Sequence, residues 1–260
     1  MRHSGEVVGD ALPQAAAGLI GPLRARRPRV HCITNSVAQA YTANMLLAAG
    51  CVPSMTLSAG EIGGFVASAQ ALLVNLGTFD PERSEATSIA LDMAQRHTLP
   101  WVLDPVFVDR SPSRLAFARE LVARRPRVVR LNHAEFEALA GTTARQENAL
   151  AYARDTGAII AIYGPTDLVT DGTRVAIIGN GHSFMAQVTA MGCAGSALAA
   201  AFLAVEPDAL RATAAALMML GIAGELAARE VKGPGTFATA ILDEVHALDA
   251  PTLLAHAKVS

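Results

Sequence analysis

Two short stretches indicate the fold class most clearly: Ala-Leu-Leu-Val-Asn-Leu at residues 71–76 and Ala-Ile-Ile-Ala-Ile at residues 158–162. Both are short runs in which apolar side chains follow one another instead of alternating with polar ones. A strand of this kind is buried on both faces, which is typical of a parallel sheet covered by helices. The two stretches therefore predict central strands of an α/β domain.

Further β-rich runs alternate along the chain with amphipathic helical runs. We expect strands at 29–33, 52–57, 71–76, 100–104, 127–131, 157–163, 167–170, 173–178 and 183–188. We expect helices at 9–26, 36–49, 61–70, 82–97, 113–124, 133–140, 144–156, 192–204, 208–230 and 236–248. This alternation predicts a mostly parallel central sheet with helices on both faces. With no linker or repeat in the chain, residues 1–260 are expected to form one domain.

The segment 163–188 has a different pattern. Asp171-Gly172 and Asn180-Gly181 separate short β-rich runs there, and such dipeptides are typical of hairpin turns. The sheet is therefore expected to end in antiparallel strands.

Composition narrows the class of protein. Of the 260 residues, 52% are hydrophobic and 17% charged, and the formal net charge is −2. This balance favours a well-buried core and gives no electrostatic reason to expect nucleic acid or a membrane surface as partner. The three cysteines form neither a disulfide framework nor a zinc pattern, and we see no signal peptide and no convincing transmembrane span. A cytoplasmic protein is expected.

Polar side chains follow several predicted strands at the point where each strand ends. In open α/β sheets, ligands bind at the carboxyl ends of the strands. Taken singly, these residues could be helix caps or turn residues, but together they indicate one site. They are Asn35, Asn75, Thr78, Asp104, Asn132 and Glu135.

Residues 188–196, Val-Thr-Ala-Met-Gly-Cys-Ala-Gly-Ser, join a small-residue turn to an alanine-rich helix. The first amides of a helix lack intrahelical partners and suit a phosphate or an oxyanion. Cys193 lies in that first turn, where the helix field is expected to lower its thiol pKa and favour the thiolate. The alternative is that Cys193 is a small buried hydrophobic residue.

Sequence blocks along most of the chain resemble the hydroxyethylthiazole kinase family of the ribokinase-like superfamily. The most specific block is Gly192-Cys193, because a family cysteine stands where most ribokinase-like enzymes have an aspartate base. The other blocks are Ile33-Thr34-Asn35-Ser36-Val37, Thr42-Ala43-Asn44, Pro53-Ser54-Met55, Leu76-Gly77-Thr78, Leu103-Asp104-Pro105-Val106, Arg130 with Asn132 and Glu135, and 233–237.

The resemblance implies a three-layer ribokinase-like fold and a phosphotransferase. The reaction would transfer the ATP γ-phosphate to the primary hydroxyl of 4-methyl-5-(2-hydroxyethyl)thiazole, a step of thiamine salvage. Cys193 would receive or steer the hydroxyl proton. The resemblance assigns substrate contacts to Asn35, Met55, Gly77 and Ala190, nucleotide contacts to Arg130, Tyr163 and Gly192, and Mg²⁺ to Asp104 and Glu135.

The resemblance also implies a homotrimer with its sites between subunits. Asn35 and Met55 belong to the N-terminal half of the chain and Cys193 to the C-terminal half. We therefore expect the two halves to meet across a subunit boundary. The alternative is that both faces pack inside one subunit.

The chain departs from the family pattern on the nucleotide side. Family glycines are replaced by Ala190, Leu131 and Phe107, and a small threonine is replaced by Tyr163. The segment 141–144 is also shorter than the corresponding segment of the family pattern. These changes leave two alternatives open: a ribokinase-like kinase for another small alcohol, or a thiazole-binding homologue with little or no catalysis.

Overall fold

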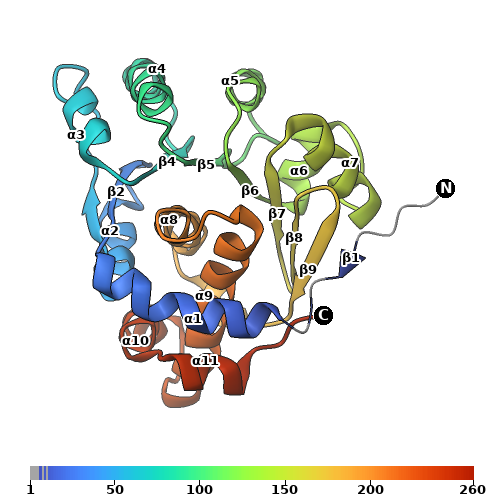
Figure 1. The fold of residues 1–260 in the computed structure, drawn as a ribbon. Coiled ribbons are helices and arrows are strands. Elements are labelled where there is room, and N and C mark those ends of the chain that lie inside the picture. The colour runs from blue at the N-terminus through green and yellow to red at the C-terminus, as the bar shows by residue number, and fades with distance from the viewer. Residues whose placement is uncertain (1–5, 8, 10) are drawn as a thin grey trace.

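The computed structural model describes residues 6, 7, 9 and 11–260, which form a nine-stranded sheet with helices on both faces (Figure 1). The strands are β1 (Glu6–Val7), β2 (Arg29–Ile33), β3 (Val52–Ser54), β4 (Ala71–Asn75), β5 (Trp101–Asp104), β6 (Val128–Asn132), β7 (Ile159–Tyr163), β8 (Asp167–Thr170) and β9 (Arg174–Ile178). The helices are α1 (Leu12–Arg26), α2 (Gln39–Ala48), α3 (Ile62–Ser68), α4 (Pro81–Arg96), α5 (Pro112–Ala123), α6 (His133–Ala140), α7 (Gln146–Thr156), η1 (Ser183–Gln187, a 3₁₀-helix), α8 (Met191–Leu203), α9 (Ala209–Glu230), α10 (Pro234–Ala247) and α11 (Ala250–His256).

The sheet order is β1-β9-β8-β7-β6-β5-β4-β2-β3, and β2 to β7 all run parallel. Every residue of β4 is buried, and so are four of the five residues of β7. The prediction of a mostly parallel sheet with doubly buried central strands is therefore confirmed. Of the predicted helix 9–26, residue 10 lies outside the described part of the chain.

The hairpin prediction is confirmed at one of its two turns. β8 runs antiparallel to both β7 and β9. The carboxylate of Asp171 accepts hydrogen bonds from the amides of Thr173 and Arg174, which shapes the turn between β8 and β9.

The predicted strand 183–188 is wrong, because residues 183–187 form the 3₁₀-helix η1. The chain leaves the sheet at Asn180, whose side chain accepts from the amide of Lys258 and donates to Glu225. The edge of β9 already pairs with β1 and forms a bridge to Val259. No place beside β9 is left for another strand.

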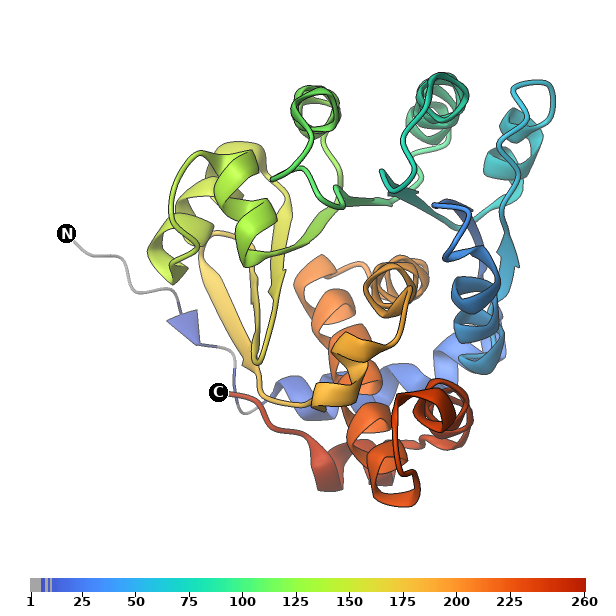
Figure 2. The same cartoon turned by 180° about the vertical axis from the view of Figure 1, so that it is seen from behind.

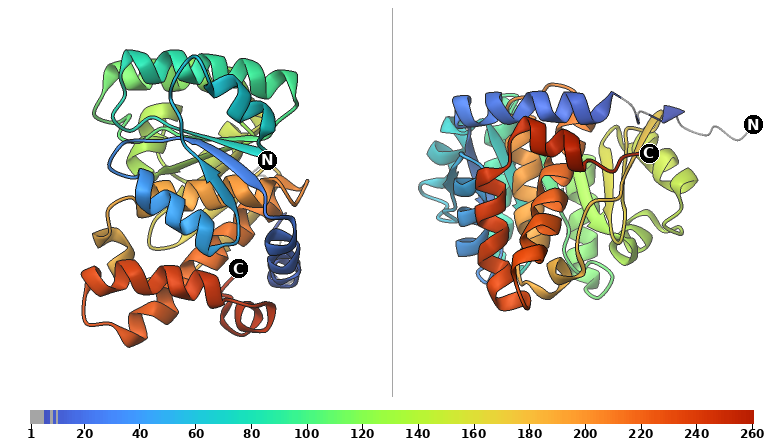
Figure 3. Two further views of the ribbon diagram at one scale, coloured as in Figure 1. Left: turned by 90° about the vertical axis from the view of Figure 1, so that its left-hand side faces the viewer. Right: turned by 90° about the horizontal axis from the view of Figure 1, so that it is seen from below.

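The helices divide between the two faces of the sheet, as Figures 1 and 2 show. α3 to α7 cover one face over the core that contains Leu72, Leu103 and Phe136. α1, α2 and α8 to α11 cover the other face, over the core that contains Leu73, Phe202 and Met218. The sheet curves around α8, which packs against β2, β4 and β5. The side view in Figure 3 shows the resulting three layers.

Helix α9 is long and apolar enough to cross a membrane by composition, but 83% of its most apolar window is buried inside the protein. Its apolar surface packs against α1, α8 and α10. The hydropathy of α9 is therefore explained by its place in the core.

Candidate active site

The candidate site lies where the carboxyl ends of the parallel strands meet the first turn of α8. β4 and β5 end at Asn75 and Asp104, which are direct neighbours in the sheet register. The backbone of α8 begins beside them, and Cys193 is its third residue. Side chains that are more than a hundred residues apart in sequence are thereby brought into contact.

Cys193 is held by two asparagine side chains. The Nδ2 atoms of Asn35 and Asn75 each lie 3.3 Å from Cys193 Sγ and donate to it. Each amide oxygen is satisfied locally, by the backbone amide of Ala38 for Asn35 and of Gly77 for Asn75. The sulfur is therefore fixed as an acceptor, and its own hydrogen can point toward a substrate hydroxyl.

The expected lowering of the Cys193 pKa is wrong. Burial raises the pKa of this thiol to about 12, and the neighbouring Asp104 charge raises it further. The two asparagine donors and Arg130 act in the opposite direction but do not compensate. Loss of solvation is the largest of these effects, because the residue is only 9% exposed. At neutral pH the group is a thiol.

Asp104 is the buried acid at the centre of the network. Its Oδ2 accepts from Asn75 Nδ2 at 2.8 Å and from Ser196 Oγ at 2.8 Å. Burial raises its pKa, against the opposing effects of Arg130 and of these two donors. Asn75 thus bridges the acid and Cys193 with its two amide hydrogens.

Glu135 forms a capping box at the start of α6. Its Oε2 accepts from the amide of Asn132, whose own side chain accepts from the Glu135 amide. Its Oε1 accepts from the amide of Phe107 at 2.8 Å. Burial and the Asp104 charge both raise the pKa of Glu135.

A buried carboxylate whose pKa is raised by a second carboxylate nearby suits a divalent cation, because a cation would offset their repulsion. Oxygen donors are those that Mg²⁺ prefers. Within the described residues there is no group of three or more side chains of the metal-binding types. An ion here would have two protein carboxylates at most, with water and phosphate oxygens completing its shell.

Arg130 extends from the middle of β6 toward α8. Its Nη1 donates to the carbonyl of Gly192 at 2.7 Å and to Ser196 Oγ at 3.3 Å. The guanidinium carbon lies 4.4 Å from the ring centroid of Tyr163. Among the described residues its buried Nε has no hydrogen-bond partner. A Cβ at Gly195 would lie 2.8 Å from Arg130 Nη2, so a larger residue there would require the guanidinium to move.

The turn before α8 has a left-handed backbone conformation at Ala190, the position at which the family pattern has glycine. Ala190 has φ +72°, in the left-handed region, so its Cβ is strained there. Met191 donates its amide to Val188, and the helical ladder begins with Ala194 donating to Ala190. In the described structure the amides between them, those of Gly192 and Cys193, have no backbone partner and are free for an anion.

Backbone strain also gathers at two neighbouring strand ends. Val106 and Phe107 have φ values of +36° and +56°, and Thr78 has +47°. Such values are uncommon for side chains with a Cβ and are a genuine outlier for a β-branched valine. Arg27, Thr98 and Arg125 also have positive φ values, and they precede β2, β5 and β6 at the opposite edge of the sheet. Positive φ by itself therefore does not distinguish the edge that carries the polar network.

The structure places Gly77 against Asn35. A Cβ at Gly77 would lie 2.7 Å from the Asn35 side chain, so this glycine permits the close approach of the two strand ends. Met55 follows the end of β3, one strand further out, and is half-buried. No hydrogen bond joins it to Cys193 among the described residues.

The expectation that Asn35 meets Cys193 across a subunit boundary is wrong, because the two side chains bond within one chain. β2 is central enough in the sheet to bring Asn35 over α8 directly. Only Met55, beyond the edge strand β3, is still a candidate for a contact with a neighbouring subunit.

Asn75 was expected at this edge as a polar strand end, and the structure gives it contacts with both Asp104 and Cys193. Ser196 joins the site although the sequence analysis did not place it there. Ser196 follows Cys193 by three residues on a helix, a spacing that puts both on one face. That spacing was the feature of the sequence from which the place of Ser196 beside Cys193 could have been predicted.

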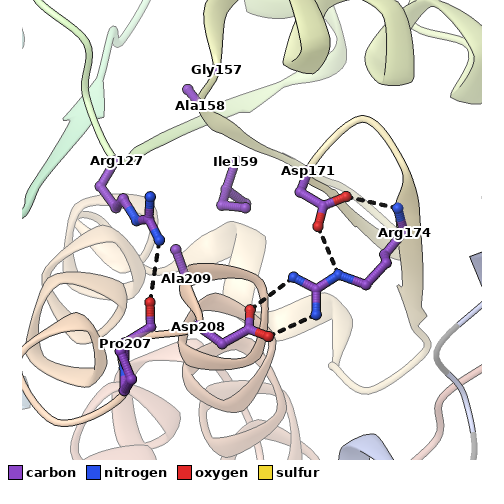
Figure 4. A pocket seen from close by; sticks show the side chains of 9 residues that line it. All are labelled: Arg127, Gly157, Ala158, Ile159, Asp171, Arg174, Pro207, Asp208 and Ala209. Atoms are coloured by element: carbon purple, nitrogen blue, oxygen red, sulfur yellow. Dashed lines mark hydrogen bonds and ion pairs between the residues drawn. The ribbon is translucent and has the colours of Figure 1, made fainter.

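Two cavities lie at the opposite, amino-terminal edge of the sheet. One, of about 480 Å³, is drawn in Figure 4, where Arg174 pairs with both Asp171 and Asp208. The other, of about 760 Å³, lies beside Trp101. The charged groups drawn in Figure 4 are largely paired with one another, and both cavities are remote from the polar network around Cys193.

Comparison with known proteins shows the family of the chain. The family model described as "Hydroxyethylthiazole kinase family" matches residues 20–251. The chain is 44% identical to a probable hydroxyethylthiazole kinase of Agrobacterium fabrum, over 94% of each chain. A solved hydroxyethylthiazole kinase structure from Pyrococcus horikoshii OT3 superposes with a TM-score of 0.91 at 33% identity, covering 95% of this chain and 98% of that one.

A ribokinase-like superfamily protein from Enterococcus faecalis V583 superposes with a TM-score of 0.67 at 14% identity, covering 88% and 90% of the two chains. At this identity the likeness concerns the fold alone. It agrees with the three-layer ribokinase-like fold expected from the sequence.

Proposed function

The chain belongs to the hydroxyethylthiazole kinase family, and on that premise we propose how its site at the carboxyl edge carries out the reaction. The enzyme transfers the γ-phosphate of ATP to the primary hydroxyl of 4-methyl-5-(2-hydroxyethyl)thiazole, in thiamine salvage. The observation that carries the proposal is the buried network Cys193–Asn75–Asp104 beside the two free amides of α8.

The alcohol is placed between the first turn of α8 and the ends of β2 and β4. Asn35, Gly77 and Ala190 border this space, and Met55 contributes an adaptable apolar surface suited to a sulfur-containing ring. The Cys193 sulfur, fixed by its two asparagine donors, orients the hydroxyl toward the γ-phosphorus.

The hydroxyl oxygen then forms a bond to phosphorus while the bond to the β–γ bridging oxygen breaks and ADP leaves. In a loose transition state most of the catalysis is positioning and charge neutralisation. The hydroxyl proton leaves late, to an oxygen of the transferred phosphoryl group, so a thiol with a pKa of about 12 serves as an orienting group instead of a base.

The phosphates are held from three sides. The free amides of Gly192 and Cys193 face the transferring phosphoryl group with the α8 dipole behind them. Arg130, braced on Gly192 and Tyr163, supplies positive charge. Asp104 and Glu135 would hold Mg²⁺, which when bound neutralises charge on the phosphates.

We further propose a single domain, a homotrimer and a cytoplasmic location. One continuous sheet contains all nine strands of the described chain, which supports one domain. Three exposed apolar side chains lie on elements near the β3 edge of the sheet, on α2, β3 and α3: Leu47 (56% exposed), Val52 (39%) and Phe65 (40%). Exposed apolar surface of this kind favours association. Three buried free cysteines suit a reducing compartment.

The test compares ATP consumption in the presence of the thiazole alcohol with calorimetry of each ligand alone. We expect turnover with this alcohol and a phosphate ester as product. Binding of the alcohol without binding of ATP would favour a non-catalytic homologue. Binding of ATP without turnover of the thiazole alcohol would favour a kinase for another alcohol.

A further inference from the structure

His31 is a fully buried imidazole in the middle of the strand β2. Its Nδ1 lies 2.9 Å from the hydroxyl of Ser54, and its Nε2 lies 3.1 Å from the carbonyl of Thr56. Buried polar groups of this kind require partners, and here both ring nitrogens have one.

The partners determine the tautomer. A carbonyl oxygen can only accept, so Nε2 carries the hydrogen and donates to Thr56. Nδ1 of a neutral ring then accepts from the Ser54 hydroxyl. Burial lowers the pKa of His31 to about 4, so the ring is neutral at physiological pH and keeps this arrangement.

The two contacts fall on either side of Met55. β3 pairs with β2 only as far as Ser54, which is opposite His31 in the register. Beyond that point the sheet ladder has ended, and the imidazole of His31 replaces the next backbone partner by binding the Thr56 carbonyl. The Thr56 hydroxyl is itself bonded to the carboxylate of Glu61, at the start of α3. Met55 is thus held in a segment tied at both ends.

We propose that His31 is a positioning residue that sets Met55 in the thiazole-binding space. This inference rests on the proposed function, in which Met55 contacts the ring. His31 touches no reacting atom and acts through the backbone on both sides of Met55. Its loss therefore weakens binding of the alcohol more than it slows phosphoryl transfer.

The experiment uses the full-length protein with His31→Phe, which keeps a ring of similar volume and removes both hydrogen bonds. Calorimetry with the thiazole alcohol alone measures Kd, and steady-state kinetics give KM and kcat. We expect Kd and KM for the alcohol to rise about tenfold, the order of one lost buried hydrogen bond, with kcat within about threefold and KM for ATP unchanged. His31→Gln, whose amide can donate to the Thr56 carbonyl, should recover part of the affinity.

A double-mutant cycle with Met55→Ala separates positioning from general damage. If His31 acts through Met55, His31→Phe changes Kd little once Met55 is gone, so the two effects are not additive. Cys32→Ala is the matched control, since it perturbs the next buried position of β2 and should lower Tm without changing Kd.

The outcomes distinguish this inference from the proposed function. No binding of the alcohol by the wild-type protein would overturn the proposed function, and the inference with it. If the wild-type protein binds the alcohol, Met55→Ala weakens this binding and His31→Phe does not, the positioning role alone is overturned. Additive effects of the two substitutions, or an equal rise in KM for ATP, would also contradict it.

Discussion

Replacing Ala190 by glycine tests the strained turn before α8. Ala190 has φ +72°, and an L-residue with a Cβ costs about 1–2 kcal/mol in that region. Glycine removes this strain but adds about 0.5–1 kcal/mol of unfolded-state freedom. The difference predicts a net stabilisation of about 0.5–1 kcal/mol. For a chain of this size that is a rise in Tm of roughly 1–4 °C.

The same substitution should tighten ATP binding, because the Cβ of Ala190 narrows the approach to the two free amides of α8. Removing about 0.7 kcal/mol of obstruction lowers the Kd for ATP roughly threefold. Thermal unfolding and calorimetry with ATP measure the two effects on one sample.

Ala151→Gly is the matched control, because Ala151 lies inside the helix α7. There glycine should destabilise by about 0.5–1 kcal/mol and leave the Kd for ATP unchanged. If Ala190→Gly destabilises as much as this control, the strain argument fails. If it stabilises the fold but ATP binds no more tightly, the obstruction argument is refuted.

Three further predictions concern Cys193, Asp104 and the assembly. Because burial raises the pKa of Cys193 to about 12, kcat should show no ionisation near pH 8.5. Cys193→Ala should lower kcat roughly tenfold, which is less than the loss expected for a general base. A rise of kcat centred near pH 8.5 that Cys193→Ala abolishes would instead show a thiolate that acts as base. The folded-state pKa of Asp104 is raised by burial, so the stability that its protonated form contributes is present below the ordinary carboxyl pKa and is lost as pH rises through the pKa of the folded state. In denaturant titrations Asp104→Asn should therefore be more stable than wild type at neutral pH, and the difference should shrink at pH 3; an equal gain at both pH values would refute the burial argument. Light scattering should give three times the 27.0 kDa chain mass, for wild type and for Met55→Ala alike, whereas a single-chain mass with full thiazole binding would refute a site that needs a second subunit.

The fold was largely predictable because the apolar pattern of its central strands indicates that they are buried on both faces. Continuous apolarity in residues 71–76 and 158–162 required cover on both faces, and parallel pairing followed. The strand predicted at 183–188 failed for a reason that no local pattern contains. Asn180 binds Lys258 and Glu225, and the edge of β9 is occupied by distant parts of the chain.

The site was predictable as a set of strand ends but not as a network. The sequence indicated that Asn35, Asp104 and Cys193 belong to one edge. It did not indicate that Asn75 would bridge two of them, because that depends on the register between β4 and β5. The thiol pKa was wrongly predicted for a similar reason: the prediction considered only the local helix field, whereas the burial that raises the pKa comes from the whole fold.

The most direct test of phosphoryl transfer at this site is the rate of phosphate-ester formation from ATP and the thiazole alcohol by wild type and by Asp104→Asn. Wild type should form ester and ADP in equal amounts. Asp104→Asn should be at least about a hundredfold slower, because it removes the buried charge that would hold a cation. The variant should still bind the alcohol within about threefold of wild type. A wild-type rate in Asp104→Asn, or a wild-type protein that binds both ligands and forms no ester, would refute the proposed function.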